Sequence, residues 1–335
     1  MRTNATTNAT ASDTTIDITY EEKIQMLRTS IDEADAILIG AGAGLSTAAG
    51  LTYSGERFEK YFADFAAEYG IQDMYSGGFY PFPDEETLWA WWSRHIYVNR
   101  YMPSDSATCL YTQLKNLVDG KDYFVLTTNV DHQFQNAGFD KERLFYTQGD
   151  YGLFETVPEQ RGEDKTDAEN AQPRTYDNEE WVSAALEAQG WVKNDAGIYA
   201  PPDDAQDMSM RIPSHLIPRD EQGRAVRMNL RIDGDFVEDA GWHAAAERYG
   251  EFLRRTDGSR SLEDSPAQRV LYLELGVGQN TPSIITYPFW RLTYDNPLAT
   301  YVTVSLDDAY VPHEIADRGL GIDADIAQVL SQLSA

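Results

Sequence analysis

Apolar side chains between residues 20 and 31 fall at the three- and four-residue spacing of one helix face. These positions are Ile24, Leu27 and Ile31. The unbroken apolar run Ala36–Ile39 follows, and then a stretch, residues 40–44, in which glycine alternates with alanine. Periodicity of this kind predicts a helix, then a buried strand, then a glycine-rich loop.

The same order of helices and apolar runs recurs along most of the chain. Further helices are predicted over Phe58–Tyr69, Thr87–Tyr101, Ala107–Leu117 and Asp323–Leu333. Further strands are predicted at Tyr123–Leu126, Arg269–Leu275 and Ala299–Val304. Strands that alternate with helices favour a parallel sheet, so we expect an α/β protein with a Rossmann-like, doubly wound sheet.

Composition divides the chain into parts. Residues 1–17 are rich in Thr, Ala and Asn without an apolar period, which is typical of a disordered leader. From residue 154 to 266 acidic and amide residues become frequent and apolar runs shorten, which indicates a smaller inserted domain. Residues 18–153 and 267–335 would then form the Rossmann-like domain, with a helical segment at about 56–105.

The overall charge limits the partners. The 335 residues include 27 Lys and Arg against 55 Asp and Glu, a net charge of -28, which disfavours nucleic acid and anionic lipid. No apolar stretch approaches the roughly 20 residues that span a bilayer, and the N-terminus lacks the features of a signal peptide. With Cys109 as the single cysteine, no internal disulfide can form, and a cytoplasmic location is expected.

Two glycine loops directly follow predicted strands. The first holds Gly40, Gly42 and Gly44, and the second holds Gly276 and Gly278. Loops of this kind can present backbone N–H groups to a phosphate, or can need glycine only to make a tight turn. The first loop departs from the usual dinucleotide pattern, but two such loops at strand ends of one parallel sheet would meet at the crevice where nucleotides bind.

A third predicted strand ends in the polar sequence Thr127–Asp131. We expect Asn129 and Asp131 at the same crevice. Amide and carboxylate groups there can orient a sugar on which positive charge develops when its glycosidic bond breaks. An Asx turn that caps the next helix is the alternative for either residue, and the two roles can coexist.

These motifs resemble, in order and spacing, the signatures of the sirtuin (Sir2) family. The stretches that carry the resemblance are Gly40–Ser46 with Ala49–Leu51, Thr128–Asp131 with Ala137–Gly138, and Gly276–Gly278 with Asn280–Pro282. Gly50–Tyr53, Asn129–Phe134, Thr147–Asp150, Asn229–Arg231 and Phe236–Asp239 resemble the macrodomain-linked class M sirtuins more closely. The resemblance runs from about residue 36 to 330 and is weaker between 156 and 224.

The resemblance implies NAD as the cofactor and assigns residues to it. Gly40, Ala41, Gly42 and Ser46 would surround its phosphate and ribose, Asn129 and Asp131 its nicotinamide ribose, and Gly276, Gly278 and Asn280 its adenosine. Tyr53 and Arg57 belong to the loop that covers nicotinamide in the family, although Arg57 can equally be an exposed loop charge. Ser305 stands near the position where the family usually has an Asn toward the adenine ribose.

Gln148 is the departure that bears on activity. Deacylating sirtuins have His at the matching position, where it takes a proton from the ribose hydroxyl. A glutamine amide cannot do so near neutral pH, and the loss of a general base costs a factor of roughly 10² to 10⁴. Deacylation should therefore be weak. The resemblance implies protein mono-ADP-ribosylation instead, with Asn129, Asp131 and Gln148 as the catalytic residues.

The resemblance also implies partners. These are a lipoylated glycine-cleavage H-like carrier protein as the acceptor, and a macrodomain hydrolase that removes the mark. Lysine deacylation or NAD hydrolysis is the enzymatic alternative. A module that senses NAD or ADP-ribose without turnover is the alternative outside enzymes.

Zinc is not expected. Many sirtuins hold their small domain with four cysteines, but the matching tract Ile217–Arg224 contains no thiol. The five histidines lack ligand spacing, and only His132, next to Asp131, could face the cleft. We therefore expect a metal-free small domain stabilised by aromatic packing. The residues expected to pack there are Trp181, Trp191, Phe236 and Trp242.

Overall fold

A six-stranded parallel sheet forms one half of the protein in the computed structural model, which describes residues 18–157, 174–202, 208–256, 268–279 and 281–334. The predicted leader lies outside the described residues. The strand order is β11-β10-β9-β1-β2-β3, and every pairing is parallel. The strands are β1 (Ala36–Ala41), β2 (Asp122–Thr127), β3 (Leu144–Tyr146), β9 (Val270–Leu275), β10 (Thr300–Ser305) and β11 (Gly319–Asp323).

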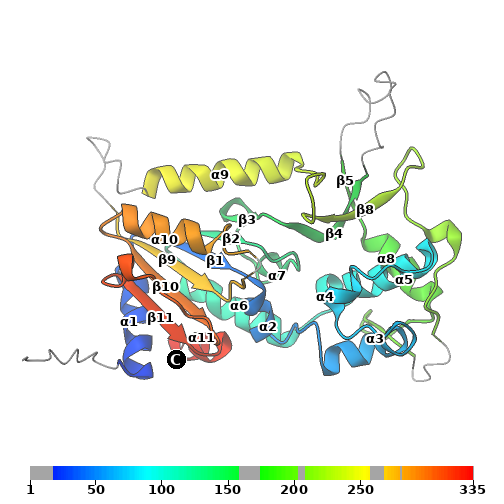
Figure 1. Cartoon of the computed structure of the whole chain (residues 1–335), viewed down its shortest axis with the longest axis horizontal. Coiled ribbons are helices and arrows are strands. Elements are labelled where there is room, and N and C mark those ends of the chain that lie inside the picture. Colours follow the sequence, from blue (N-terminus) through cyan, green and yellow to red (C-terminus); the bar gives the residue numbers. More distant parts are fainter. Residues whose placement is uncertain (1–17, 158–173, 203–207, 257–267, 280, 335) are drawn as a thin grey trace, which may run out of the picture.

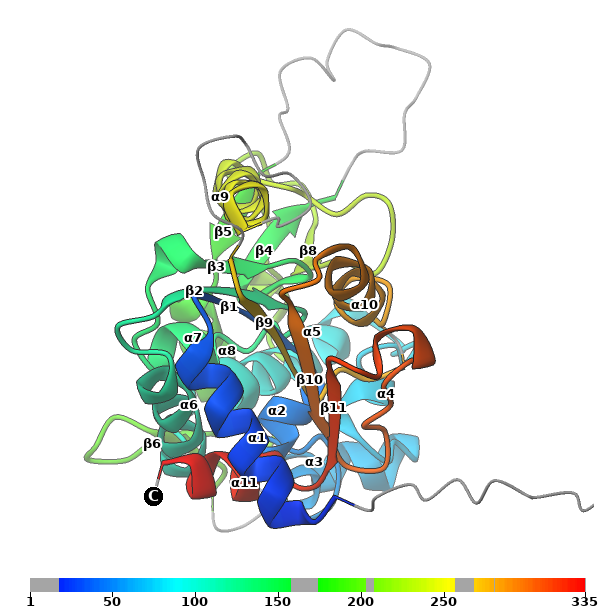
Figure 2. The same ribbon diagram turned by 90° about the vertical axis from the view of Figure 1, so that its left-hand side faces the viewer.

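Helices cover both faces of this sheet, as Figure 2 shows. One face carries α1 (Tyr20–Glu33), α2 (Ala43–Ala48), α6 (Asp105–Leu117), α7 (Gln133–Asn136) and α11 (Ile326–Leu333). The other carries α9 (Ala240–Thr256) and α10 (Thr286–Asp295). Since β1 and β9 are buried along their whole length, their sequences are apolar apart from Glu274 in β9. The Rossmann-like α/β fold predicted from the sequence is confirmed.

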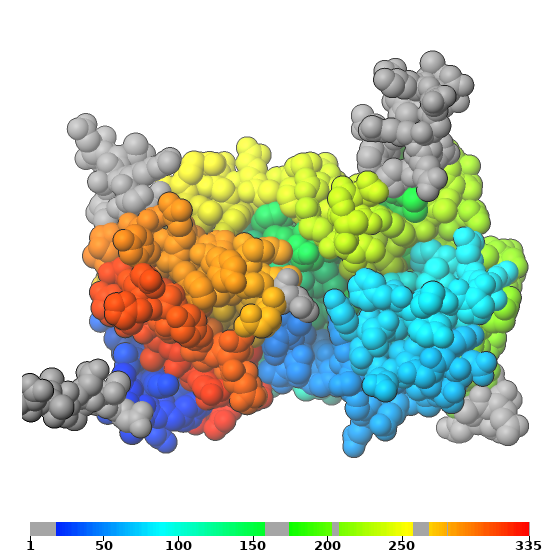
Figure 3. All heavy atoms as spheres, viewed as in Figure 1, coloured from blue at the N-terminus to red at the C-terminus, as the bar shows by residue number. Residues whose placement is uncertain are grey.

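A second body of helices and short strands lies beside the sheet (Figures 1 and 3). Its helices are α3 (Glu56–Tyr69), α4 (Met74–Gly77), α5 (Glu85–Ile96) and α8 (Glu179–Ala188), with a π-helical turn over Tyr97–Tyr101. An antiparallel sheet joins β4 (Gly149–Thr156) to β5 (Thr175–Asp177) and β8 (Val226–Leu230), and β6 (Val192–Lys193) pairs with β7 (Tyr199–Ala200). One aromatic-rich core holds these elements together.

Two segments pack against a different part of the protein from the one to which the expected domain boundaries assign them. Helices α3 to α5 fall in the segment assigned to the Rossmann-like domain, yet their aromatic faces share a core with β4, β8 and α8. Helix α9 falls in the expected insertion, yet Phe252 packs against Phe124 on the large sheet. Both segments are amphipathic, and an apolar face alone does not specify which sheet it covers.

Strand order places a crevice beside β1. The chain runs from β1 to β2 and β3 on one side of the sheet, and returns to pair β9, β10 and β11 on the other side. The direction of winding therefore changes between β1 and β9. The loops after β1, β2 and β9 leave the carboxyl edge of the sheet at this switch point, which is where parallel α/β sheets bind ligands.

Candidate functional site

The two glycine loops are joined to each other backbone to backbone. Gly42 N–H donates to Leu275 O at 3.0 Å, and Gly44 N–H donates to Gly276 O at 2.9 Å. A Cβ on Gly42 would lie 2.6 Å from Gly276 O, and Gly276 itself has a positive φ of 59°. Glycine is therefore required here for close approach of two backbones. The steric requirement, which is the alternative to phosphate binding considered from the sequence, is enough to explain glycine at positions 42 and 276.

A buried polar network connects α2 to the loop after β2. Ser46 Oγ donates to Asp131 Oδ2 at 2.5 Å and lies 2.8 Å from the hydroxyl of Tyr111. Asn129 Nδ2 donates to Gly42 O at 3.0 Å and to Ser46 Oγ at 3.1 Å. The sequence-predicted residues Ser46, Asn129 and Asp131 thus meet in one network, anchored to the first glycine loop.

Burial sets the protonation of this network. It raises the pKa of the Asp131 carboxyl, while the Ser46 hydrogen bond acts in the opposite direction. It also raises the pKa of the Tyr111 hydroxyl well above its usual value. Asp131 Oδ1 accepts the backbone N–H of Gln133 at 3.2 Å, so the Asx turn considered from the sequence is present together with the contact to Ser46.

This network forms part of the wall of a cleft with a volume of about 760 Å³. Among the predicted site residues, those that line it are Ser46, Tyr53, Asn129, Asp131, Gln148 and Gly278. The cleft lies between the carboxyl edge of the large sheet and the second body. Its volume falls within the range of small-molecule sites.

Gln148 lies at the junction between the large sheet and β4. Its side chain lines the cleft, and Nε2 donates to Thr147 Oγ1 at 3.3 Å. Its backbone carbonyl accepts the N–H of Arg231 at 3.0 Å, which ties the two cleft-lining residues together. An uncharged amide therefore stands where deacylating sirtuins have an imidazole.

The loop after α2 contributes Tyr53 and Arg57, which differ in orientation. Tyr53 lines the cleft, its hydroxyl lies 2.8 Å from that of Tyr151, and burial raises its pKa to about 12. Arg57 donates to Thr52 O at 2.9 Å, to Asn99 Oδ1 at 2.8 Å and to Val98 O, and it lines a separate cavity of about 320 Å³. Its guanidinium thus holds the loop, and its expected contact with NAD remains a prediction.

Three of the remaining predicted cofactor residues lie in strands of the large sheet and do not line the cleft. Gly40 is inside β1, where Ile285 and Phe289 of the opposite face leave no room for a Cβ. Ala41 is the last residue of β1, and Ser305 ends β10. Asn280 lies outside the described residues.

His132 pairs with a carboxylate outside the lining of the cleft. It adopts a left-handed conformation with φ 67°, and Nδ1 lies 2.7 Å from Asp150 Oδ2. Asp150 also accepts Gly152 N–H and lies 3.4 Å from Arg100 Nε. This pairing fixes the turn between β4 and the loop after β2.

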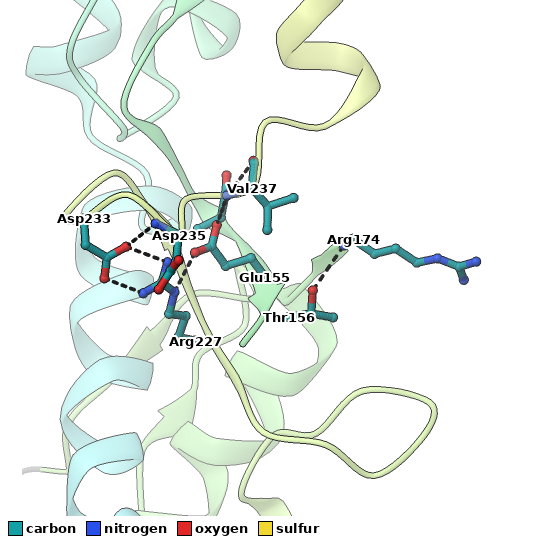
Figure 4. A network of polar contacts seen from close by, with 8 residues as sticks. Glu155, Thr156, Arg174, Arg227, Asp233, Asp235 and Val237 are labelled. Atoms are coloured by element: carbon teal, nitrogen blue, oxygen red, sulfur yellow. Dashed lines mark hydrogen bonds and ion pairs between the residues drawn. The ribbon is translucent and has the colours of Figure 1, made fainter. Parts of the chain in front are cut away.

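A charged network holds the loop after β8 against the antiparallel sheet (Figure 4). The buried Glu155 carboxylate on β4 accepts from Arg227 Nε at 2.6 Å, Asn229 Nδ2 at 2.7 Å and Val237 N–H at 2.9 Å. Arg227 also pairs with Asp233 at 2.7 Å. The contacts tie both ends of the loop after β8 to the antiparallel sheet and so position the cleft residues Leu230 to Ile232.

Some residues of the site were missed in the sequence. Tyr111 and His95 both lie in predicted helices, where the periodicity marks them only as core positions. The hydroxyl of Tyr111 proved to be a partner of Ser46, and the ring of His95 lines the cleft. No local pattern reveals either role, because each depends on a neighbour distant in the sequence.

The tract that matches the zinc-binding region of many sirtuins is closed by an ion pair. Asp220 accepts the N–H groups of Gln222 and Arg224, and its Oδ2 lies 2.6 Å from Arg224 Nε. In the part of the chain that the structure describes, no group of three or more His, Cys, Asp or Glu side chains is arranged to hold a metal ion. Trp181 and Trp191 pack in the core of the second body, whereas Trp242 packs against Phe145 of the large sheet.

Comparison with known proteins identifies the family. No protein-family model matches the chain. It is 34% identical over 312 residues to the protein ADP-ribosyltransferase of Staphylococcus aureus (strain Mu50), covering 92% of this chain and 86% of that protein. The chain belongs to the sirtuin-type protein ADP-ribosyltransferases. It is also 28% identical over 331 residues to a probable bifunctional ADP-ribose hydrolase/ADP-ribosyltransferase of Fusarium oxysporum f. sp. cubense, of which it spans 50%.

The fold of this sirtuin-type transferase agrees with that assignment. A crystal structure of a Sir2 homologue in complex with NAD superposes with a TM-score of 0.50 at 15% identity, over 92% of each chain. The family makes this protein an NAD-dependent enzyme. The cleft fits the cofactor's size, and Ser46, Asn129 and Asp131 offer hydroxyl, amide and carboxylate groups suited to a ribose.

The last two properties of this sirtuin-type chain concern membrane-spanning helices and charge. Within the described ranges, no helix has the length and apolar character needed to cross a bilayer. The net charge of -28 applies to the full sequence, and the charged side chains that line the cleft, in the described residues, are Asp131 and Arg231.

Proposed function

We propose that this protein is a mono-ADP-ribosyltransferase that moves ADP-ribose from NAD to a side chain of an acceptor protein. The bond between nicotinamide nitrogen and ribose C1′ breaks, nicotinamide leaves with the bonding electrons, and an acceptor nucleophile forms a new bond to C1′. NAD supplies the ADP-ribosyl group. The chain's own residues bind it, orient the ribose and stabilise the charge that develops on the sugar.

Asn129 and Asp131 suit the ribose end of this reaction. Bond breaking puts positive charge on the ribose ring. A nearby carboxylate stabilises this charge, and the stabilisation is stronger where less water screens the two charges from each other. Asp131 is 7% exposed, and its carboxylate is held by Ser46. The hydrogen bonds from Asn129 to Gly42 and Ser46 fix the amide, so that its oxygen can accept from a ribose hydroxyl.

Gln148 is the observation that carries the choice of transfer over deacylation. Its side chain lines the same cleft as Asn129 and Asp131, and its amide cannot accept a proton near neutral pH. Transfer to a nucleophile, unlike deacylation through the ribose hydroxyl, does not need a base at this position. The family membership of the chain supports the same choice.

We further propose that the protein is a class M sirtuin located in the cytoplasm. Its acceptor would be a lipoylated glycine-cleavage H-like carrier, and a macrodomain hydrolase would be the partner that removes the ADP-ribose. The hydrolase partner gains support from the fungal relative, whose name joins ADP-ribose hydrolase and ADP-ribosyltransferase. The other elements rest on the motif resemblance described above.

Two other functions have specific support. NAD hydrolysis or residual lysine deacylation uses the same ribose chemistry, with water or an acyl-lysine amide as the acceptor. A sensing module that binds NAD without turnover is favoured by the amide at position 148 beside an intact ribose network. Nicotinamide release separates the sensor from both enzymes.

Intact-mass spectrometry tests the proposal. A lipoylated H-like carrier incubated with the protein and NAD should gain the mass of one ADP-ribose, while the matched carrier with an unmodified lysine should gain none. Labelling of both carriers would refute the lipoyl requirement. Nicotinamide release without labelling would favour hydrolysis.

A further inference from the structure

A second cavity lies behind the segment that borders the cleft, and its volume is about 320 Å³. Leu51 lines both spaces, and the residues after it divide between them. Residues 52–54 line the cleft, whereas Glu56 and Arg57 line the second cavity. The segment 51–57 is therefore a partition between the two spaces.

Apolar side chains make up the buried part of this cavity. Leu51, Tyr61 and Val98 are buried, and they come from the partition, α3 and the π-helical turn. Met102 and Pro103, at the approach to α6, complete the apolar lining. We name the space the α3–α6 cavity. Its volume lies at the lower end of the range of small-molecule sites, and its lining suits a short hydrocarbon body.

Arg57 brings a positive charge to the α3–α6 cavity without a paired counter-charge. Its guanidinium donates to neutral acceptors, which are Thr52 O, Val98 O and Asn99 Oδ1. In the part of the chain that the structure describes, no carboxylate forms an ion pair with it, and Asp131 in the cleft acts on it only without contact. Burial lowers the pKa of this guanidinium, because a charge removed from water without a partner is unfavourable.

The hydrogen bonds of Arg57 leave part of the guanidinium unused. Nη1 donates to Thr52 and Asn99, and Nη2 donates to Val98. Nε and one hydrogen of Nη2 therefore have no hydrogen-bond partner among the described residues. Neighbouring N–H groups of a guanidinium bind the two oxygens of a carboxylate in parallel. The free groups of Arg57 suit a ligand of this kind.

Lys60 adds a second cation to the lining of the α3–α6 cavity. It is exposed, its Nζ lies 5.2 Å from the centroid of the Tyr61 ring, and it has no ion pair within the described ranges. Ser104 caps α6 and lies at the positive end of that helix's dipole. Glu56 is the lining carboxylate, and it is exposed. The lining is thus positive on balance, in a chain whose net charge is -28.

We propose that the α3–α6 cavity is a second ligand site, separate from the cleft, that takes a small monocarboxylate with a short apolar body. The carboxylate oxygens accept from Arg57 and Lys60, and the body packs among Leu51, Val98 and Met102. Because Arg57 also donates to the backbone of the partition, the ligand fastens that segment from behind. The inference does not rest on the proposed transferase function, since it concerns binding outside the cleft.

Hexanoate, hexanamide and acetate test both parts of the ligand. Hexanamide has the body without the charge, and acetate has the charge without the body. In NMR titrations of the full chain labelled with ¹³C-methyl methionine, hexanoate should shift the Met102 signal and leave that of Met26, exposed on α1, unchanged. We expect hexanoate to bind at least about tenfold more tightly than either other probe. No shift at Met102, or equal binding of the three probes, would overturn the inference.

Three variants test the charged groups. Lys60→Gln should weaken hexanoate binding about threefold to fivefold. Arg57→Lys keeps the charge but loses the paired N–H groups, and should weaken binding about tenfold. Lys141→Gln, at an exposed lysine after α7, removes the same charge as Lys60→Gln and should leave binding unchanged. Unchanged binding in Lys60→Gln or in Arg57→Lys would contradict the proposed site.

Saturating NAD tests whether the site is separate from the cleft. Hexanoate should still shift the Met102 signal with NAD present, because the partition lies between the two spaces. Competitive displacement of hexanoate by NAD would overturn the inference and would make Arg57 part of the cofactor site, as its place in the sequence motif predicts. Hexanoate binding by a protein that transfers no ADP-ribose would contradict the transferase and leave the α3–α6 site standing.

Discussion

Ser46 and Asp131, which lie 85 residues apart, share a 2.5 Å hydrogen bond in the wall of the cleft. Ser46 follows the first glycine loop, and Asp131 follows the second strand of the sheet. The bond therefore joins α2, which follows the first glycine loop, to the loop after β2 that carries Asn129 and Asp131. It makes the protonation of Asp131 depend on the position of α2.

The raised pKa of Asp131 predicts an acid limb in the pH profile. Only the ionised carboxylate stabilises a positive ribose, so nicotinamide release should rise with pH through the Asp131 pKa, which burial moves above its usual value. Ser46→Ala removes a hydrogen bond that favours the ionised form and should move this limb to higher pH. Steady-state nicotinamide release between pH 4 and 8 measures it.

Two variants control this prediction. Asp131→Asn should lower the rate on the order of 10²-fold and abolish the acid limb. Ser30→Ala, at a serine on α1 whose hydroxyl donates to the backbone of its own helix, should reproduce the wild-type profile. An unshifted limb in Ser46→Ala would show that the bond does not control Asp131.

Gln148 predicts the direction of an activity switch. Gln148→His places an imidazole where the resemblance puts the base of deacylation, so deacylation of an acetyl-lysine peptide should rise by about 10-fold or more. Peptide mass spectrometry with NAD present measures the product. A Gln148→His protein that binds NAD but gains no deacylation would show that the acyl-lysine has no access to the cleft.

The joined glycine loops predict a stability effect. Gly42→Ala forces a Cβ to within 2.6 Å of Gly276 O and should destabilise the fold by about 1–3 kcal/mol. Gly234→Ala is the matched control, because no atom lies within 4 Å of the position that its Cβ would take and its φ is not positive. Urea denaturation of both variants measures the free energies of unfolding. Equal values would refute the close-approach account.

Glu274 predicts a pH dependence of stability. Burial in β9 raises the pKa of its carboxyl to about 7, and Oε2 has no partner in the described residues. The folded state then binds more protons than the unfolded state between about pH 4.5 and 7, so this group's contribution to stability falls as pH rises through that window.

Glu274→Gln should remove that contribution. Between pH 5 and 7.5 the variant should lose less free energy of unfolding than the wild type, by on the order of 2 kcal/mol. Glu251→Gln, at an exposed glutamate on α9, should behave as the wild type. Parallel pH profiles of the wild type and Glu274→Gln would contradict the buried, proton-binding carboxyl.

The sheet could be predicted because its strands are buried on both faces. The runs at Ala36–Ile39 and Arg269–Leu275 are apolar almost throughout, and each precedes a glycine loop, so both the strand and its ligand-facing end can be recognised. Asn129 and Asp131 were found for the same reason. They follow β2 directly, and the carboxyl ends of parallel strands lie at one edge.

Other features depend on contacts that no local pattern contains. The sequence places Arg57 in the loop expected at the cofactor, but it does not reveal that the side chain bonds to Thr52, Val98 and Asn99. Tyr111 has the spacing of a core residue, but its hydroxyl completes the Ser46 network. The location of α9 likewise follows from its aromatic contacts across sequence-distant strands, which periodicity cannot specify.

The most direct test of the account is transfer of labelled ADP-ribose from NAD to the lipoylated carrier by the wild type and by Asn129→Ala. We expect the wild type to add one ADP-ribose per carrier, with nicotinamide released in equal amount, and Asn129→Ala to lose at least about 10²-fold in rate. Full labelling by Asn129→Ala would contradict the assignment of the reaction to this cleft. NAD binding by the wild type with neither labelling nor nicotinamide release would contradict the transferase.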